Sequence, residues 1–66
     1  MKLWIARDLD GTLSLSDGEE PKSILGVWIF NKNHYNIDNR LFPEVTFENS
    51  PQKIELKLVK NESNKT

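Results

Sequence analysis

The sequence contains no cysteine, which excludes disulfide bonds and thiolate metal sites, and its single histidine supplies too few ligands for an ordinary zinc site. Such devices usually stabilise small domains, because chains below roughly 70 to 80 residues bury too little apolar surface in one core. With 66 residues, the chain has room for one domain with a small core. Oligomerisation is the stabilising device that the composition leaves open.

Long apolar runs and a large excess of one charge are also missing. No segment approaches the roughly 18 to 20 apolar residues of a membrane span, and the start at Lys2 lacks the apolar core of a signal peptide. A formal net charge of -1 argues against a protein that holds nucleic acid mainly by neutralising phosphates. We therefore expect a soluble, cytoplasmic protein with no membrane partner.

The charged residues are distributed unevenly along the chain. Residues 8–20 hold five acidic side chains and no basic one, whereas the C-terminal part is rich in lysine. That part contains four lysines and two glutamates: Lys53, Lys57, Lys60 and Lys65, and Glu55 and Glu62. The simplest interpretation is two solvated surfaces of opposite sign, and the alternative is a field that steers a charged ligand.

Residues 3–16 carry the clearest local pattern, that of a β-hairpin. Asp8 opens a type I turn, and Gly11 supplies the positive φ that closes a three-residue loop with a one-residue bulge. This turn sets a register in which Arg7 lies opposite Leu13. Four apolar side chains then share one face of the hairpin: Leu3, Ile5, Leu13 and Leu15. The other face is polar apart from one large aromatic side chain, Trp4.

The middle of the chain alternates between turn residues and short apolar segments. Residues 17–23 have turn chemistry and predict an exposed loop, and residues 24–26 predict a single helical turn that ends at a glycine. Residues 27–30 are β-branched and aromatic, which predicts a strand that is apolar on both faces. Residues 35–37 predict a short fourth strand.

The C-terminal half is expected to hold two more strands after a capped turn at residues 38–41. Phe42 precedes a proline, so we expect it to be extended. Residues 44–48 predict a strand with Val45 and Phe47 pointing inward. Residues 52–58 predict another strand, whose apolar side consists of Ile54, Leu56 and Leu58.

No stretch has the helical apolar spacing over about 10 to 12 residues that a stable amphipathic helix needs. The predicted class is therefore mostly β, a small antiparallel meander or open barrel of five to six short strands with one short helical turn. Residues 1–60 are expected to form a single β domain, and residues 61–66 a disordered tail. The predicted core consists of Leu3, Ile5, Leu13, Leu15, Ile37, Phe42, Val45, Phe47, Ile54, Leu56 and Leu58.

The segment from Asp8 to Leu13, Asp-Leu-Asp-Gly-Thr-Leu, resembles the first motif of the haloacid-dehalogenase-like phosphatases. The resemblance implies Asp8 as nucleophile, Asp10 as general acid/base and a bridging magnesium ion. That family builds a parallel sheet, whose crossovers take a dozen or more residues each, and the chain after Leu13 offers neither crossover helices nor the family's later motifs. We therefore interpret the match as coincidental and expect no enzymatic activity.

The same aspartates also match part of a calcium-binding loop that would run from Asp8 to Glu19. The glycine falls at the fourth position of that loop instead of the sixth, and no helix flanks the loop. We therefore expect no catalytic residue, no metal site and no cofactor.

Four aromatic residues are the candidate partner-binding side chains: Trp4, Trp28, Phe30 and Tyr35. In the strand at residues 27–30, Val27 and Ile29 point one way, and Trp28 and Phe30 point the other. Two complete cores are hard to build from so short a chain, so one of these pairs should meet another molecule, unless an internal second core buries them.

The function predicted from these features is that of a non-enzymatic small β domain. It would bind a protein partner, or a second copy of itself, through an aromatic face or an open sheet edge. The alternative is a nucleic-acid-binding β module, for which the plausible basic neighbours of the aromatic residues are Lys2, Arg7 and Lys32. A fragment of a haloacid-dehalogenase-like phosphatase is a distant third.

Several pieces of the chain resemble a group of small uncharacterised proteins of gut Bacteroides-type bacteria and their phages. These pieces are residues 3–8 with Asp10 and Gly11, residues 41–51 and residues 55–58. The resemblance implies a bacterial or phage cytoplasmic setting and implies nothing about mechanism.

Overall fold

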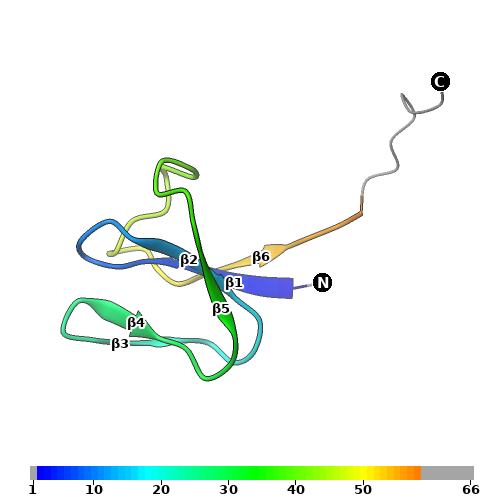
Figure 1. Ribbon diagram of the computed structural model, residues 1–66, viewed down its shortest axis with the longest axis horizontal. Coiled ribbons are helices and arrows are strands. Elements are labelled where there is room, and N and C mark those ends of the chain that lie inside the picture. The colour runs from blue at the N-terminus through cyan, green and yellow to red at the C-terminus, as the bar shows by residue number, and fades with distance from the viewer. Residues whose placement is uncertain (1, 59–66) are drawn as a thin grey trace.

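The computed structural model describes residues 2–58, which form six strands in two antiparallel sheets (Figure 1). The strands are β1 (Lys2–Arg7), β2 (Leu13–Ser16), β3 (Lys22–Ile24), β4 (Val27–Ile29), β5 (His34–Ile37) and β6 (Gln52–Glu55). The larger sheet has the order β5-β2-β1-β6, and β3 pairs with β4. The predicted mostly β, open antiparallel class is confirmed. The tail predicted at residues 61–66 lies outside the described residues.

No helix in residues 2–58 is long and apolar enough to cross a membrane.

The β1–β2 hairpin follows the turn that was predicted from the sequence. The Gly11 amide donates to the Asp8 carbonyl at 2.9 Å, and the Asp8 amide donates to the Thr12 carbonyl at 2.8 Å. Gly11 has a φ of 99°, a left-handed value that favours glycine. Arg7 lies opposite Leu13 and Ile5 opposite Leu15, so the predicted register is confirmed.

Gly11→Ala is expected to lower the free energy of unfolding by about 1 kcal/mol or more, because alanine resists positive φ. A Cβ at Gly11 would meet no atom within 4 Å, so the cost comes from the backbone and not from a clash. Gly11→Asn is the matched control, since asparagine tolerates this conformation and should lose less. Urea denaturation followed by circular dichroism measures both. Equal losses in the two variants would contradict the conformational explanation.

One face of the larger sheet carries the hydrophobic core. Ile5, Leu13 and Val45 are buried in its centre, and Leu3 is buried beside them. Leu15, Ile37 and Ile54 pack around this cluster, as predicted. Three predicted core residues are exposed instead, which corrects the prediction: Phe42, Leu56 and Leu58. The last two lie beyond β6, which ends at Glu55 instead of running to residue 58 as predicted.

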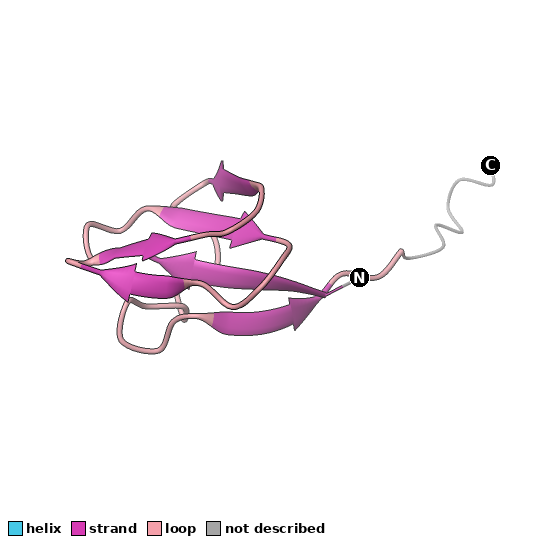
Figure 2. Cartoon of the chain, turned by 90° about the horizontal axis from the view of Figure 1, so that it is seen from below, coloured by secondary structure: helices cyan, strands magenta, loops and turns pink. Residues whose placement is uncertain are grey.

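The other face of the larger sheet is also covered, although its side chains are small and polar. Ala6, Ser14 and Ser16 are buried on this face. The β3–β4 hairpin lies beside the sheet, with β4 in contact with β1 (Figures 1 and 2).

The β3–β4 hairpin corrects two predictions for residues 17–26. Lys22 and Ser23 belong to a strand and not to the predicted loop, and the predicted helical turn at residues 24–26 is wrong. Leu25 and Gly26 have φ values of 52° and 83°, as in the two-residue turn that joins tightly twisted strands. The direct pairing of Ile24 with Val27 across this turn outweighs the weak helical preference.

Residues 38–51 form a loop of successive turns that covers the core face. The predicted turn at its start is confirmed, since the Arg40 amide donates to Asp38 Oδ1 at 2.9 Å. The predicted strand at residues 44–48 is wrong, although Val45 is buried and Phe47 half-buried, as expected. The prediction of an extended Phe42 is also wrong, because its φ is 50°.

Arg7 accounts for the path of this loop. Its Nε, Nη1 and Nη2 atoms donate to five backbone carbonyl oxygens, those of Gly11, Asn39, Leu41, Phe42 and Val45. A guanidinium group has five N–H donors in one plane, and here each of them has a carbonyl partner. The chain must reverse at Phe42 to turn successive carbonyls toward this plane, which prevents a strand from forming there.

Candidate functional site

Asp8 and Asp10 both take part in holding turns together. Asp8 Oδ1 accepts the Trp28 amide at 3.0 Å, which ties the first hairpin to β4. Asp10 Oδ1 accepts the Thr12 amide at 3.0 Å. This backbone hydrogen bond from Thr12, with a further one from its side chain, lowers the pKa of Asp10 below its ordinary value of 3.8. The antiparallel sheet around them differs from the parallel sheet that the phosphatase resemblance implies.

Within residues 2–58, no group of three or more His, Asp or Glu side chains is placed to hold a metal ion. Glu19, the last residue of the possible calcium loop, lies instead at the edge of a surface depression, where its amide donates to Asn31 Oδ1 at 3.2 Å.

Trp28 faces the inside of the molecule. Its Nε1 donates to the Arg7 carbonyl at 3.0 Å, and its ring centroid lies 5.9 Å from that of Phe47. The side chain is half-buried. Trp28 and Phe47 therefore form a small second cluster that joins β4 to the loop of residues 38–51.

The other three aromatic candidates lie in separate places. Trp4 is half-buried, and the Lys53 Nζ atom lies 5.0 Å from its ring centroid. Tyr35 is exposed on the core face, opposite Leu15. Phe30 stacks on His34 with 4.6 Å between ring centroids. The four predicted residues do not form one surface.

The outward side of the β3–β4 hairpin is an exposed apolar surface, which we name the hairpin face. It consists of Lys22, Ile24, Val27 and Ile29, which pair across the two strands. Ile24, Val27 and Ile29 are 57%, 41% and 50% exposed. The alternation that turns Trp28 inward turns its two neighbours outward, as predicted. The predicted pairing of Phe30 with Trp28 is wrong, because strand β4 ends at Ile29 and Phe30 lines a depression together with Ile29.

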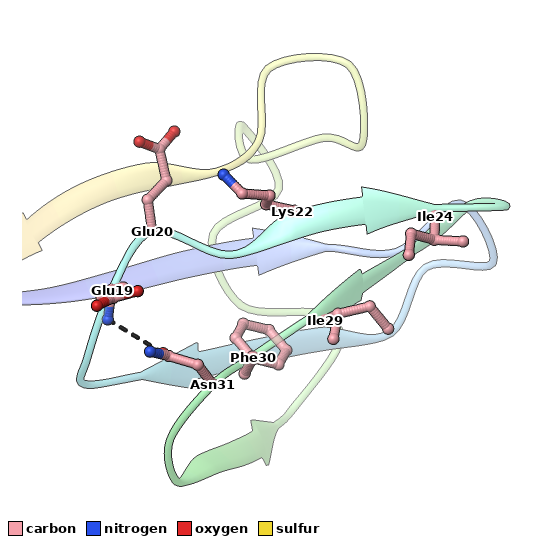
Figure 3. A pocket seen from close by; sticks show the side chains of 7 residues that line it. All are labelled: Glu19, Glu20, Lys22, Ile24, Ile29, Phe30 and Asn31. Carbon is pink, nitrogen blue, oxygen red and sulfur yellow. Dashed lines mark hydrogen bonds between the residues drawn. The ribbon is translucent and has the colours of Figure 1, made fainter.

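A depression of about 300 Å³ lies beside the hairpin face (Figure 3). Ile24, Ile29 and Phe30 provide its apolar part. Its polar part is formed by Glu19, Glu20, Lys22 and Asn31. Figure 3 places the two glutamates and Asn31 toward one end and Ile24 toward the other. The depression is thus apolar along one half and carries carboxylates at the opposite end.

A second depression, of about 190 Å³, lies beside strands β1, β2 and β5. Its lining residues are Leu3, Leu15, Ser16, Asp17, Tyr35 and Leu56. Asp17 Oδ1 is buried there without a hydrogen-bond partner among the described residues. The oxygen is closed off from solvent, so it offers no accessible ligand-binding atom.

Sequence reasoning missed half of the hairpin face, because it places Lys22 in an exposed loop and Ile24 in a helical turn. Glu19 and Glu20, which line the neighbouring depression, do lie in an exposed loop as predicted. The available signal was the pair Leu25-Gly26 between two β-branched residues, because a two-residue connection that contains glycine favours a hairpin.

Comparison with family models, with curated proteins and with solved structures finds no match to this chain. The resemblances to haloacid-dehalogenase-like phosphatases and to small Bacteroides-type proteins therefore rest on short motifs alone.

Proposed function

We propose that the protein is a non-enzymatic binding module that holds another polypeptide chain on its hairpin face. The observation that carries the proposal is the exposure of three β-branched side chains, Ile24, Val27 and Ile29, next to the apolar part of the depression. Contiguous apolar side chains with a polar rim are typical of protein-binding surfaces. Covering them contributes about 25 cal/mol for each Å² of apolar surface removed from water.

The open shape of the depression also favours a polypeptide over a small substrate. Pockets for drug-sized ligands span roughly 300 to 1,000 Å³ and enclose most of the ligand. At about 300 Å³ and open to solvent, this depression suits one or two side chains of a partner. Phe30 lines this depression, and in the proposed function it contacts the partner, whereas Trp28 faces the inside of the molecule.

The charges around the depression favour a protein over a nucleic acid. An aromatic platform for single-stranded nucleic acid carries Arg and Lys beside its rings. Here Phe30 shares the depression with Glu19 and Glu20, and among the described residues Lys22 is the one basic residue that lines it. Two carboxylates would repel the phosphates of a bound strand.

Two outcomes would replace the proposed function. Tight binding of a labelled single-stranded oligonucleotide that weakens steeply with salt would favour the nucleic-acid module, because counterions are released on such binding. Magnesium-dependent hydrolysis of p-nitrophenyl phosphate that is lost in Asp8→Asn would favour the phosphatase. We expect neither, since Asp8 is already engaged with the Trp28 amide.

Photo-crosslinking tests the proposed surface in cells that produce the protein. With p-benzoylphenylalanine in place of Ile29, we expect a crosslinked adduct with a polypeptide. The matched control places the same group at Leu41, which is similarly exposed but lies in the loop of residues 38–51. Absence of an adduct at position 29, or equal adducts at both positions, would contradict the proposal. The adduct mass, relative to the 7.7 kDa chain, identifies the partner as a second copy or another protein.

A further inference from the structure

The end of the described chain has the chemistry that the hairpin face and its depression would accept. Strand β6 ends at Glu55, and the sequence continues as Leu56-Lys57-Leu58-Val59-Lys60. Leu58 is 98% exposed, and Lys57 is exposed beside it. The segment is rich in apolar and cationic residues and has no acidic residue.

The depression has an apolar part followed by an acidic end, just as the segment has a leucine followed by a lysine. Its apolar half contains Ile29 and Phe30, and its polar end carries Glu19 and Glu20 (Figure 3). In an extended chain, residues two apart share one side at a spacing of about 6 to 7 Å. A strand that places Leu58 on the apolar half therefore directs Lys60 along the depression, toward the two carboxylates.

The segment does not reach the hairpin face of its own chain within the described residues. In Figure 1, the chain leaves β6 on the side away from the β3–β4 hairpin. The same segment of a second copy can approach the hairpin face, because its path does not start from β6 of the first copy.

We propose that the depression beside the hairpin face binds residues 56–60 of a second copy of the chain. This inference rests on the proposed function, because it names the polypeptide that the surface holds. Leu58 occupies the apolar half, and Lys60 pairs with Glu19 and Glu20. One depression and one short segment bury less area than a standard interface, so the dissociation constant should be at the weak end, between about 10 µM and about 1 mM.

Such a contact joins two different surfaces of the two copies. It can close reciprocally, so that each copy donates its segment to the other, or it can continue from copy to copy as a chain. Both arrangements use the same pairing of segment and depression, so both are tested by the same substitutions.

Sedimentation velocity of the full-length chain between about 10 µM and about 1 mM tests the proposal. Wild type should sediment faster as concentration rises. Glu20→Lys and Lys60→Glu should each weaken association at least fivefold, and the double variant that exchanges the two charges should recover most of the loss. Glu48→Lys and Lys65→Glu are the matched controls, because they change the same charges elsewhere, and they should associate like wild type.

Circular dichroism of each variant confirms that its sheet content is intact. A monomeric wild type throughout this range, or a charge exchange that recovers nothing, would overturn the proposal. If a position-29 adduct with a different protein forms while wild type stays monomeric, the proposed function stands and only the second copy is excluded. If no adduct forms at position 29 under any condition, the proposed function itself fails.

Discussion

Arg7→Lys is expected to lower the free energy of unfolding by about 3 kcal/mol, although the substitution keeps the positive charge. The guanidinium group of Arg7 donates to five carbonyl oxygens, and an ammonium group has three donors and no planar fork. Lysine keeps the charge and most of the apolar stem. The loss therefore measures the hydrogen-bond geometry and not the charge.

The size of this effect depends on how far each of the five hydrogen bonds is protected from water. Hydrogen bonds to charged groups contribute roughly 1.5 to 3 kcal/mol each when protected from water, and less when exposed. The bonds to Val45 and Gly11 are partly buried, whereas those to Asn39, Leu41 and Phe42 are exposed, so the sum is much smaller than five full bonds. A domain of this length is stable by only about 3 to 10 kcal/mol, so the variant should lose a large part of its stability.

Arg40→Lys is the matched control for the Arg7 experiment. Arg40 lies in the same loop, but its side chain is exposed and forms an ion pair with Asp38 at 2.8 Å. Exposed ion pairs contribute little, so its unfolding midpoint in urea should stay close to that of wild type. If both variants unfolded at the same urea concentration, or if neither changed, the central role assigned to Arg7 would be wrong.

The part of the fold that could be predicted is the part determined by neighbouring residues. The sequence from Asp8 to Gly11 specifies its own turn, and this turn alone places Leu13 and Leu15 on the face of Leu3 and Ile5. The capped turn at Asp38 is local in the same way, because its side chain bonds an amide two residues on. Both were predicted correctly.

The loop of residues 38–51 could not be predicted because its partner is far away in sequence. Arg7 is 32 to 38 residues from the loop carbonyls that it binds. A signal was present, however. By alternation Arg7 falls on the same face as Leu3 and Ile5, where a charged side chain requires polar partners from elsewhere in the chain.

The candidate site was predicted only in part, because exposure depends on how the second hairpin packs. The sequence separates Val27 and Ile29 from Trp28 and Phe30, but it does not say which pair faces solvent. The indole Nε1 of Trp28 donates to the carbonyl of Arg7, which lies 21 residues earlier in the sequence. This long-range bond is what leaves Val27 and Ile29 outside.

Trp28→Lys is expected to lower the free energy of unfolding by about 2 to 3 kcal/mol, because a half-buried aromatic side chain is replaced by a charge. The variant loses the contact with Phe47 and the hydrogen bond from Nε1 to the Arg7 carbonyl. Trp28→Phe separates the contribution of the ring contact from that of the hydrogen bond. It keeps an aromatic ring beside Phe47 and loses the donor, so it should cost about 1 kcal/mol.

Ile29→Lys is the control that distinguishes an inward side chain from a binding one. Ile29 is the neighbour of Trp28 on the same strand, but half of its side chain is exposed, so the substitution should leave the unfolding midpoint nearly unchanged. Urea denaturation followed by circular dichroism at 218 nm compares the three variants without relying on tryptophan fluorescence. A Trp28→Lys variant as stable as wild type, together with an unfolded Ile29→Lys variant, would mean that the hairpin packs on the sheet through its opposite side.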